Sequence, residues 1–292
     1  MERLWVMKRL LYVVLAGIAA VAGLPASPAS AAPAGSSVTT VSGTFETTVN
    51  GPITGTVNCP GGYRMVGSGG TSLFGGDVEF TALAPTTDFT GARFVAKVVE
   101  PPLDGHPAAM LVVAYCAPAA QFADVVTVRT NDHRFRPGQF SEGIGRCPAG
   151  YYAFGGGGYY SSGGSGFLGA ASSNSSNSPS ADGTAWVYSG TMPSSANEQV
   201  TIIQCAPRSG RDVVVQFGNL APNPFNEISS FVDCPSGYTA IAGGFYASNS
   251  DGSVVNGAAV TDSQQGGRPG RWFVLGFTQA NTKLVALAQC VI

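Results

Sequence analysis

Beyond the first thirty or so residues, hydrophobic and polar positions alternate with the two-residue period of a β-strand. The alternation is clearest where three segments run into a cysteine, at 111–116, 200–205 and 284–290. Successive side chains of a strand point to opposite faces, so these segments are typical of half-buried strands. No apolar pattern at helical spacing persists there for a dozen residues. The sequence therefore predicts an all-β fold.

The same order of segments occurs three times. Each unit opens with a β-branched run, passes through the turn sequence Cys-Pro-x-Gly-Tyr and a glycine run, and continues into an aromatic-led strand. The turns begin at Cys59, Cys147 and Cys234, which are 88 and 87 residues apart. We therefore predict three homologous antiparallel β repeats, with the boundaries 32–120, 121–209 and 210–292.

The turn and the glycine run make specific demands on the backbone. Proline fixes φ, and the glycine before the tyrosine can adopt the positive φ that a tight turn needs. The glycines that follow, such as Gly155 to Gly158, have low strand propensity. They indicate a β-bulge, or a place where another backbone or an aromatic ring approaches closely.

The middle of each unit varies in length and composition. We interpret 71–91, 161–183 and 247–270 as surface loops, the second being the most flexible because it is rich in Ser, Gly and Asn. The linkers between units, 117–121 and 206–210, are so short that the units should pack together or share sheets. Two architectures fit: three small tandem β-domains, or a pseudo-threefold arrangement like a β-prism.

Six cysteines form a framework of two per repeat. The pairing that respects the repeat joins residues 57, 58 and 56 positions apart, namely Cys59–Cys116, Cys147–Cys205 and Cys234–Cys290. Closing a loop of that size stabilises a fold by about 4 kcal/mol on the chain-entropy model. A metal site is disfavoured because closely spaced cysteine pairs are absent and the chain has only 2 histidines. We predict three disulfides, no metal and no cofactor.

The first 31 residues resemble a secretory signal peptide. Arg3, Lys8 and Arg9 precede an apolar run at 10–24, and the small residues 29–31 suit a signal peptidase. The apolar run is shorter than a membrane-spanning helix, so an uncleaved anchor is the less favoured alternative. We expect a secreted, extracellular protein that has no membrane attachment once the signal is removed.

Charge argues against two classes of partner. Without residues 1–31, the 15 basic residues fall to 12 and the 17 acidic residues to 16, so the net charge becomes about four negative. Such a chain, with only 11% charged residues, would not neutralise the phosphates of a nucleic acid or an anionic membrane. Extracellular glycans and secreted proteins remain as expected partners, and the sequence does not indicate the oligomeric state.

Catalytic residues are hard to find. A glycosidase needs two carboxylates about 5–10 Å apart, for which Asp77, Glu79 and Asp88 are candidates, but sixteen acids in a mature chain make some such pair inevitable. Neither His106 nor His133 has the sequence context of a catalytic triad. We therefore predict that the protein is not an enzyme.

Aromatic residues and one basic segment are the candidate contact residues. Trp186 and Trp272, with Phe94 taken as the equivalent, are either core residues or exposed platforms for sugar rings, and strand aromatics favour the core. Tyr159, Tyr160 and Phe167 adjoin the most variable loop and are better candidates for an exposed surface. The basic segment 129–136, with Arg146 nearby, could bind an acidic sugar or a phosphate. It occurs in one repeat only, however, and we interpret it as a solvated loop between strands.

The repeat resembles one found in uncharacterised secreted proteins of actinobacteria. The resemblance rests on Cys-Pro-x-Gly-Tyr, the glycine run, the aromatic strand and the final strand ending Val113-Ala114-Tyr115-Cys116-Ala117, and it covers almost all of the chain after the signal. A weaker similarity is to vitelline membrane outer layer protein I, whose three repeats also begin near Cys-Pro-x-Gly. That similarity implies a pseudo-threefold β-prism with a carbohydrate-related or matrix role, although its repeats are much shorter.

Together these features favour a secreted, non-enzymatic binding or structural protein that recognises a cell-wall or other extracellular glycan, or a protein, through variable loops. Two alternatives stay open. One is a secreted hydrolase or protease inhibitor with an unrecognised site, and the other is a subunit of an extracellular assembly.

N-terminal sequencing of the protein recovered from culture medium tests the export prediction. We expect the mature chain to begin near Ala32, because the small residues at 29–31 precede it. A chain that retains Met1 would contradict the predicted cleavage.

Overall fold

A computed structural model describes ten segments of the chain: 38–47, 52–73, 78–98, 107–163, 174–208, 213–218, 227–248, 259–266, 270–277 and 283–291. The predicted signal peptide, residues 1–31, lies outside the described residues. The described residues belong to one compact unit, Ser37–Ile292. No helix long and apolar enough to cross a membrane occurs in the part of the chain that the structure describes.

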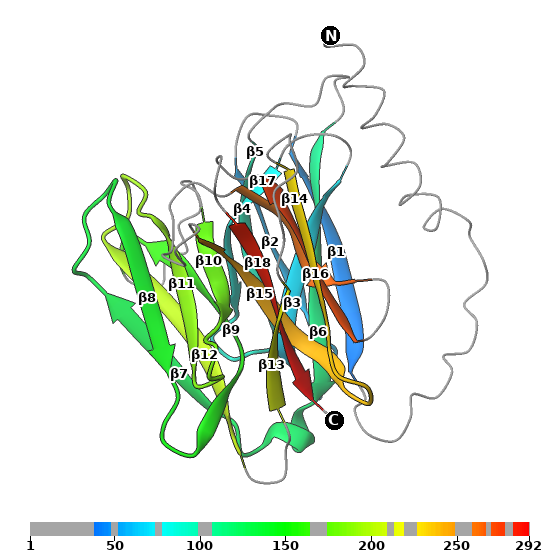
Figure 1. Cartoon of the computed structure of the whole chain (residues 1–292). Coiled ribbons are helices and arrows are strands. Elements are labelled where there is room, and N and C mark those ends of the chain that lie inside the picture. The colour runs from blue at the N-terminus through cyan, green and yellow to red at the C-terminus, as the bar shows by residue number, and fades with distance from the viewer. Residues whose placement is uncertain are drawn as a thin grey trace. The chain divides into compact units, whose positions relative to one another are not determined.

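The described segments form antiparallel β-strands and one short 3-10 helix, Ala119–Phe122 (Figure 1). Repeat 1 contains β1 (Thr39–Thr47), β2 (Pro52–Asn58), β3 (Tyr63–Leu73), β4 (Val78–Pro85), β5 (Gly91–Val98) and β6 (Ala108–Pro118). Repeat 2 contains β7 (Val126–Asp132), β8 (Phe140–Arg146), β9 (Tyr151–Ser161), β10 (Asn174–Pro179), β11 (Ala185–Thr191) and β12 (Glu198–Pro207). Repeat 3 contains β13 (Val213–Gly218), β14 (Glu227–Asp233), β15 (Thr239–Ser248), β16 (Ala259–Gln265), β17 (Arg271–Phe277) and β18 (Lys283–Val291). The all-β prediction is confirmed.

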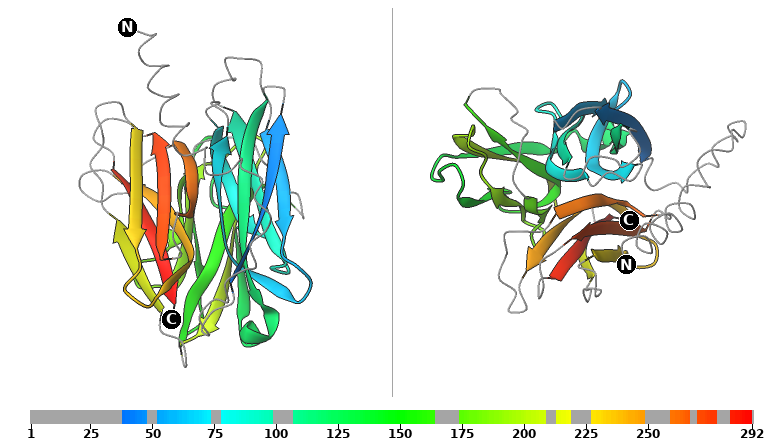
Figure 2. Two further views of the ribbon diagram at one scale, coloured as in Figure 1. Left: turned by 90° about the vertical axis from the view of Figure 1, so that its right-hand side faces the viewer. Right: turned by 90° about the horizontal axis from the view of Figure 1, so that it is seen from above.

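The strands form three six-stranded sheets, and each sheet is shared by two repeats. Their strand orders are β1-β6-β3-β16-β17-β14, β13-β18-β15-β10-β11-β8 and β2-β5-β4-β9-β12-β7. Each repeat thus gives three strands to one sheet and three to another. In Figure 2, seen from above, the three repeats appear as adjacent groups of blue to cyan, green, and yellow to red strands. Three independent tandem domains are therefore excluded, as the short linkers suggested.

Two kinds of strand join the repeats. We call β3, β9 and β15 the glycine strands, and β4, β10 and β16 the middle strands. Each glycine strand pairs with the middle strand of another repeat: β3 with β16, β15 with β10, and β9 with β4. This exchange runs cyclically through all three repeats. The middle strands lie within segments interpreted from sequence as surface loops, so that interpretation is wrong for these residues.

The glycine strands approach neighbouring backbones more closely than a side chain allows. A Cβ on Gly67 would lie 2.1 Å from the carbonyl oxygen of Ile241, and one on Gly157 would lie 2.1 Å from that of Leu83. On Gly244 it would lie 1.9 Å from the carbonyl oxygen of Asn177. Real Cβ atoms essentially never come nearer than 3.0 Å to another heavy atom. The glycine runs are thus required where one repeat contacts the next, and the predicted close approach is confirmed.

Each glycine strand also carries a β-bulge, which appears as a shift in strand register. The shift lies between Met65 and Gly67 in β3 and between Ala240 and Ala242 in β15. In β9 it lies opposite the residues between Ile203 and Cys205 of β12. A bulge interrupts the ladder and leaves backbone groups to be paired otherwise.

Glutamine amides from other strands supply those partners. Gln204 Nε2 donates to the Met65 carbonyl at 2.5 Å, Gln265 Nε2 to that of Ala240 at 3.0 Å, and Gln289 Nε2 to that of Ala153. Gln289 Oε1 also accepts the Gly155 N–H at 3.2 Å. Gln204 and Gln289 are fully buried and cross between repeats, so they fix the relative register of the repeats.

The disulfides close each repeat as predicted, joining Cys59 to Cys116, Cys147 to Cys205 and Cys234 to Cys290. In each turn the tyrosine N–H bonds to the proline carbonyl at 3.0–3.1 Å. The glycines just before these tyrosines have φ of +82°, +83° and +90°, which confirms the predicted glycine conformation.

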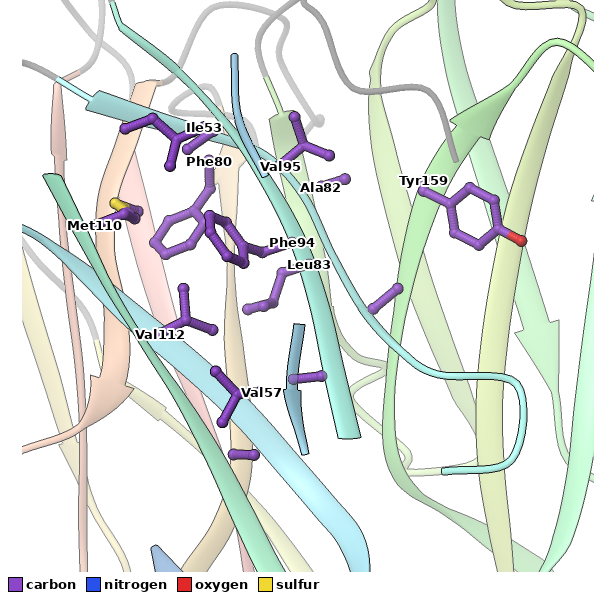
Figure 3. Packing of buried hydrophobic residues seen from close by; sticks show 14 of the residues in the cluster. Ile53, Val57, Phe80, Ala82, Leu83, Phe94, Val95, Met110, Val112 and Tyr159 are labelled. Carbon is purple, nitrogen blue, oxygen red and sulfur yellow. The ribbon is translucent and has the colours of Figure 1, made fainter. Parts of the chain in front are cut away.

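The hydrophobic core of repeat 1 fills the space between its two groups of strands (Figure 3). Phe80, Phe94, Leu83, Met110 and Val112 gather there and are almost completely buried. The same cluster extends to the opposite face of the shared sheet through a second set of buried residues: Ala82, Val95, Tyr159, Val200 and Ile202. Figure 3 shows Tyr159 standing apart from the phenylalanines, beyond Ala82 and Val95.

Substituting alanine for Gly157 tests the role of the close approach. We expect Gly157→Ala to lower the free energy of unfolding by about 1–3 kcal/mol, because the added methyl must displace the backbone of β4. The control is Gly61→Ala, where a Cβ would meet no atom within 4 Å; this change should stay within about 0.5 kcal/mol. Chemical denaturation without reductant measures both. Equal effects would contradict the proposed packing.

Candidate functional site

The two tryptophans proposed as sugar platforms are core residues. Trp186 and Trp272 are 2% and 0% exposed. Their indole N–H groups donate to Asn177 Oδ1 at 2.8 Å and to Ser263 Oγ at 3.2 Å. The rings lie where Gly156 and Gly243 leave room, since a Cβ on either glycine would come within 2.7 Å of an indole atom. The preference for the core over an exposed platform is therefore confirmed.

The register also corrects the equivalent of these tryptophans in repeat 1. Backbone bonds from Cys59, Cys147 and Cys234 reach the carbonyls of Thr90, Thr184 and Gly270, which are therefore equivalent residues. Two positions further on stand Ala92, Trp186 and Trp272. The equivalent of the two tryptophans in repeat 1 is therefore Ala92 and not Phe94. Phe94 lies two residues further along the strand and corresponds to Tyr188 and Val274. Ser68 stands in repeat 1 where the other repeats have Gly156 and Gly243, which fits the small Ala92.

The tyrosines expected on an exposed surface are buried as well. Tyr160 is 3% exposed, and its hydroxyl lies 3.0 Å from Ser141 Oγ, with its ring 5.4 Å from that of Tyr188. Burial raises the pKa of Tyr160 well above its ordinary value. Tyr159 is 6% exposed. Both side chains are buried, so neither presents an open ring face. Phe167 lies outside the described residues.

The candidate carboxylates differ in burial and in hydrogen bonding. Asp88 organises the turn before β5, accepting hydrogen bonds from Thr86 Oγ1 at 2.7 Å and from Thr90 N at 3.1 Å. These bonds, the Thr86 side chain first, lower the pKa of Asp88. Glu79 is buried in β4, opposite Lys97 of β5. Asp77 and His106 lie outside the described residues.

Asp182 forms the equivalent turn in repeat 2. It accepts hydrogen bonds from Ser180 Oγ at 2.6 Å and from the backbone and side chain of Thr184 at 3.0 and 2.8 Å. The Ser180 bond, followed by those from Thr184, lowers the pKa of Asp182 to about 2. Asp88 and Asp182 therefore have a structural role in matching turns.

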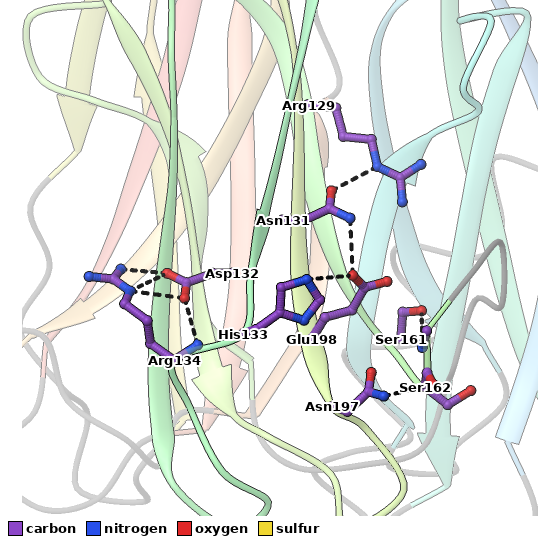
Figure 4. Close-up of polar contacts among 10 residues, drawn as sticks. Arg129, Asn131, Asp132, His133, Arg134, Ser161, Ser162, Asn197 and Glu198 are labelled. Atoms are coloured by element: carbon purple, nitrogen blue, oxygen red, sulfur yellow. Dashed lines mark hydrogen bonds and ion pairs between the residues drawn. The ribbon is translucent and has the colours of Figure 1, made fainter.

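The basic segment 129–136 is in part a strand. Residues up to Asp132 belong to β7, an edge strand, so the interpretation of a solvated loop is wrong for that portion. Asp132 and Arg134 form an ion pair that lies on the other side of β7 from Asn131 (Figure 4). Arg134, chiefly through its side-chain hydrogen bonds, lowers the pKa of Asp132. Arg146, predicted nearby, is an exposed residue at the end of β8.

A set of charged and polar residues shares one face of the sheet formed by repeats 1 and 2. We call it the charged face and define it by Arg93 of β5, Tyr159 of β9, Glu198 of β12, and Arg129 and Asn131 of β7. Strand register places the residues of β7 and β9 on either side of β12, because Tyr159 and Asn131 both lie opposite Val200, and Arg129 lies opposite Ile202. Arg93 lies on β5, on the other side of β4. Arg129 and Asn131 are exposed, whereas Tyr159 and Glu198 are buried.

Glu198 is the centre of a hydrogen-bonded chain on this face. Arg129 Nε donates to Asn131 Oδ1 at 2.9 Å, and Asn131 Nδ2 donates to Glu198 Oε2 at 3.0 Å. His133 Nε2 lies 3.5 Å from the same oxygen, with its side chain 64% exposed (Figure 4). Glu198 itself is 3% exposed, and no described residue bonds to its other oxygen, Oε1. The chain thus holds a buried carboxylate, one of whose oxygens has no hydrogen-bond partner among the described residues.

Charged residues from both repeats affect the pKa of the Tyr159 hydroxyl. Burial raises the pKa of the Tyr159 hydroxyl, while the positive charges of Arg129 and Arg93 act in the opposite direction and the negative charge of Glu198 adds to the rise. All three charges are therefore close enough to act on one phenol. Arg93 belongs to repeat 1 and the other residues to repeat 2, so the face exists only because the sheet is shared.

The other two repeats show that the scaffold does not require these charges. Glu198 stands seven positions before Cys205, where the equivalent residues are Ala109 and Lys283. The register gives Ser42 and Phe217 as equivalents of Arg129. The equivalents of Arg93 are Val187 and Phe273. These differences between repeats are present in the sequence, but the equivalent positions could be compared only once the strand register was known.

No family model matches this chain, and no curated protein is significantly similar to it in sequence. Among the described residues, no group of three or more His, Cys, Asp or Glu side chains is placed to hold a metal ion.

The Asp182 turn supplies a pH test. Because its folded pKa is lower than that of an unfolded aspartate, Asp182 stabilises the fold above about pH 4, and this contribution disappears as the pH falls through about 2. We expect an NMR titration of the Asp182 carboxyl to have its midpoint near 2. We also expect Asp182→Asn to reduce the loss of stability between pH 5 and pH 2. A midpoint near 4 would contradict the hydrogen-bonded turn.

Proposed function

We propose that this protein is a secreted binding protein that recognises an extracellular or cell-wall glycan through the charged face. The observation that carries the proposal is the buried Glu198 carboxylate, which is held by Asn131 and keeps Oε1 without a partner among the described residues. Buried polar atoms in proteins are nearly always hydrogen-bonded, so an exception needs a partner such as water or a ligand. A hydroxyl group of a sugar is a suitable donor.

The neighbouring groups suit a polyhydroxylated ligand. A carboxylate accepts hydrogen bonds, a guanidinium donates them, and an amide does both. Glu198, Arg129 and Asn131 present this combination within one hydrogen-bonded chain. Sugar hydroxyls both donate and accept, and can therefore bond to all three. This chemistry supports binding, and it replaces the exposed aromatic platforms that the sequence suggested.

The rest of the molecule supports a stable extracellular scaffold. Three disulfides suit the oxidising conditions met by exported proteins. The shared sheets hold Arg93 and Arg129 on one surface although they come from different repeats. A rigid surface loses little conformational entropy when a ligand binds.

Retention of the oxidised protein on insoluble peptidoglycan, chitin and cellulose tests the proposal, with Glu198→Gln as the variant. We expect saturable retention of the native protein on at least one polymer, and a loss of about tenfold in affinity in the variant, because a hydrogen bond to a charged group is removed. Stability should stay unchanged or rise, since the change removes an incompletely paired buried charge.

The matched control is Glu142→Gln on β8, which removes a partly exposed carboxylate from a different sheet and should leave retention unchanged. If Glu198→Gln lowered stability and left retention intact, Glu198 would have a structural role only. Failure of the native protein to bind any polymer would reject the glycan proposal.

A further inference from the structure

A histidine stands beside the buried carboxylate of the charged face. His133 Nε2 lies 3.5 Å from Glu198 Oε2, the oxygen that also accepts the hydrogen bond from Asn131 Nδ2 at 3.0 Å (Figure 4). Glu198 is 3% exposed, whereas the His133 side chain is 64% exposed. Protons from the solvent can therefore reach the imidazole, while the carboxylate next to it is shielded.

In the part of the chain that the structure describes, the partners of Glu198 Oε2 are Asn131 and His133, and both are neutral while the imidazole is unprotonated. The guanidinium of Arg129 bonds to Asn131 and not to Glu198. Buried charges in proteins are normally paired with an opposite charge. Protonation of His133 places such a charge beside Oε2. The imidazole is thus a counter-ion for Glu198 whose charge depends on pH.

The other charged groups near His133 keep one state between about pH 5 and pH 8. Asp132 and Arg134, which flank it in the chain, pair with each other on the other side of β7, and the hydrogen bonds from Arg134 lower the pKa of Asp132. Arg129 stays protonated throughout this range. On β9, burial raises the pKa of the Tyr159 hydroxyl above its ordinary value. Among these groups, the imidazole is the one that changes charge.

We propose that His133 makes ligand binding at the charged face pH-dependent, and that binding weakens as the imidazole becomes protonated. This rests on the proposed function and concerns the regulation of the same site. Protonated His133 donates to Glu198 Oε2 and neutralises part of the carboxylate charge. A ligand hydroxyl that donates to Oε1 then meets a weaker acceptor, because hydrogen bonds to charged groups are the stronger ones. The imidazole lies partly in solvent, which limits the effect to about threefold to tenfold in affinity.

The first test needs no ligand. The side-chain amide of Asn131 bonds to the same oxygen that His133 approaches, so the NMR signals of this amide report the protonation of the imidazole. We expect these signals to shift between about pH 8 and pH 5 in the native protein, and to stay constant in His133→Gln, whose side chain does not titrate. His106→Gln, which changes the other histidine of the chain, is the control and should match the native protein. Constant Asn131 signals in the native protein would overturn the inference.

The second test measures affinity by isothermal titration calorimetry at about pH 7.5 and pH 5.5, on either side of the ordinary histidine pKa. The probe is a soluble fragment of peptidoglycan, chitin or cellulose, whichever polymer retains the native protein. We expect the native protein to bind at least about threefold more weakly at the lower pH, and His133→Gln to bind equally at both. Tighter binding at the lower pH would contradict the inference. A pH dependence that persists in His133→Gln would also contradict it, because another group would then be responsible.

The two proposals fail in different ways. If the native protein binds the fragment with the same affinity at both pH values, the role of His133 is overturned and glycan binding stays intact. Retention on none of the three polymers would reject the proposed function and, with it, pH-dependent binding, whatever the Asn131 signals show.

Discussion

The close contact between the glycine strands and neighbouring backbones is the constraint on which the rest of the structure depends. Where Gly67, Gly157 and Gly244 meet carbonyl oxygens of other repeats, no side chain fits. The approach permits β3, β9 and β15 each to pair with a strand from another repeat. The bulges, the buried glutamines and the sharing of sheets follow from it, because backbone groups brought so close must all find partners.

Sharing sheets gives the molecule three faces with the same backbone and different chemistry. The face formed by repeats 1 and 2 carries Arg93, Arg129 and Glu198. The face formed by repeats 1 and 3 has apolar residues at several equivalent positions, including Phe273 and Leu275, with Phe231 51% exposed at its edge. The residues that the scaffold needs recur in at least two repeats, as the cysteines, the two buried tryptophans and the glutamines Gln204 and Gln289 do. Charges that occur once are better explained by function than by folding.

Local chemistry made much of the fold predictable. The cysteine pairs, the turns, and the strands that lead into Cys116, Cys205 and Cys290 depend on neighbouring residues, and the repeat displays them three times. The middle strands could not be predicted in this way. β10 contains only Asn, Ser and Pro, and becomes a strand because β11 and β15 lie on either side of it. The site was missed for a related reason. Tyr159 appeared to adjoin an open loop, and Glu198 forms its hydrogen bond with Asn131, which lies 67 residues away in the sequence.

Hydrogen-exchange mass spectrometry of the protein with and without saturating soluble fragments of the polymer that retains it tests the central claim most directly, namely that the charged face alone is the binding surface on a threefold scaffold. The account predicts added protection confined to β5, β7, the start of β12 and the end of β9. The equivalent strands β1, β6 and β17 should be unchanged, which makes the other repeats an internal control. Protection centred on β14 and β17, around Phe231, or spread equally over all three faces, would contradict the account.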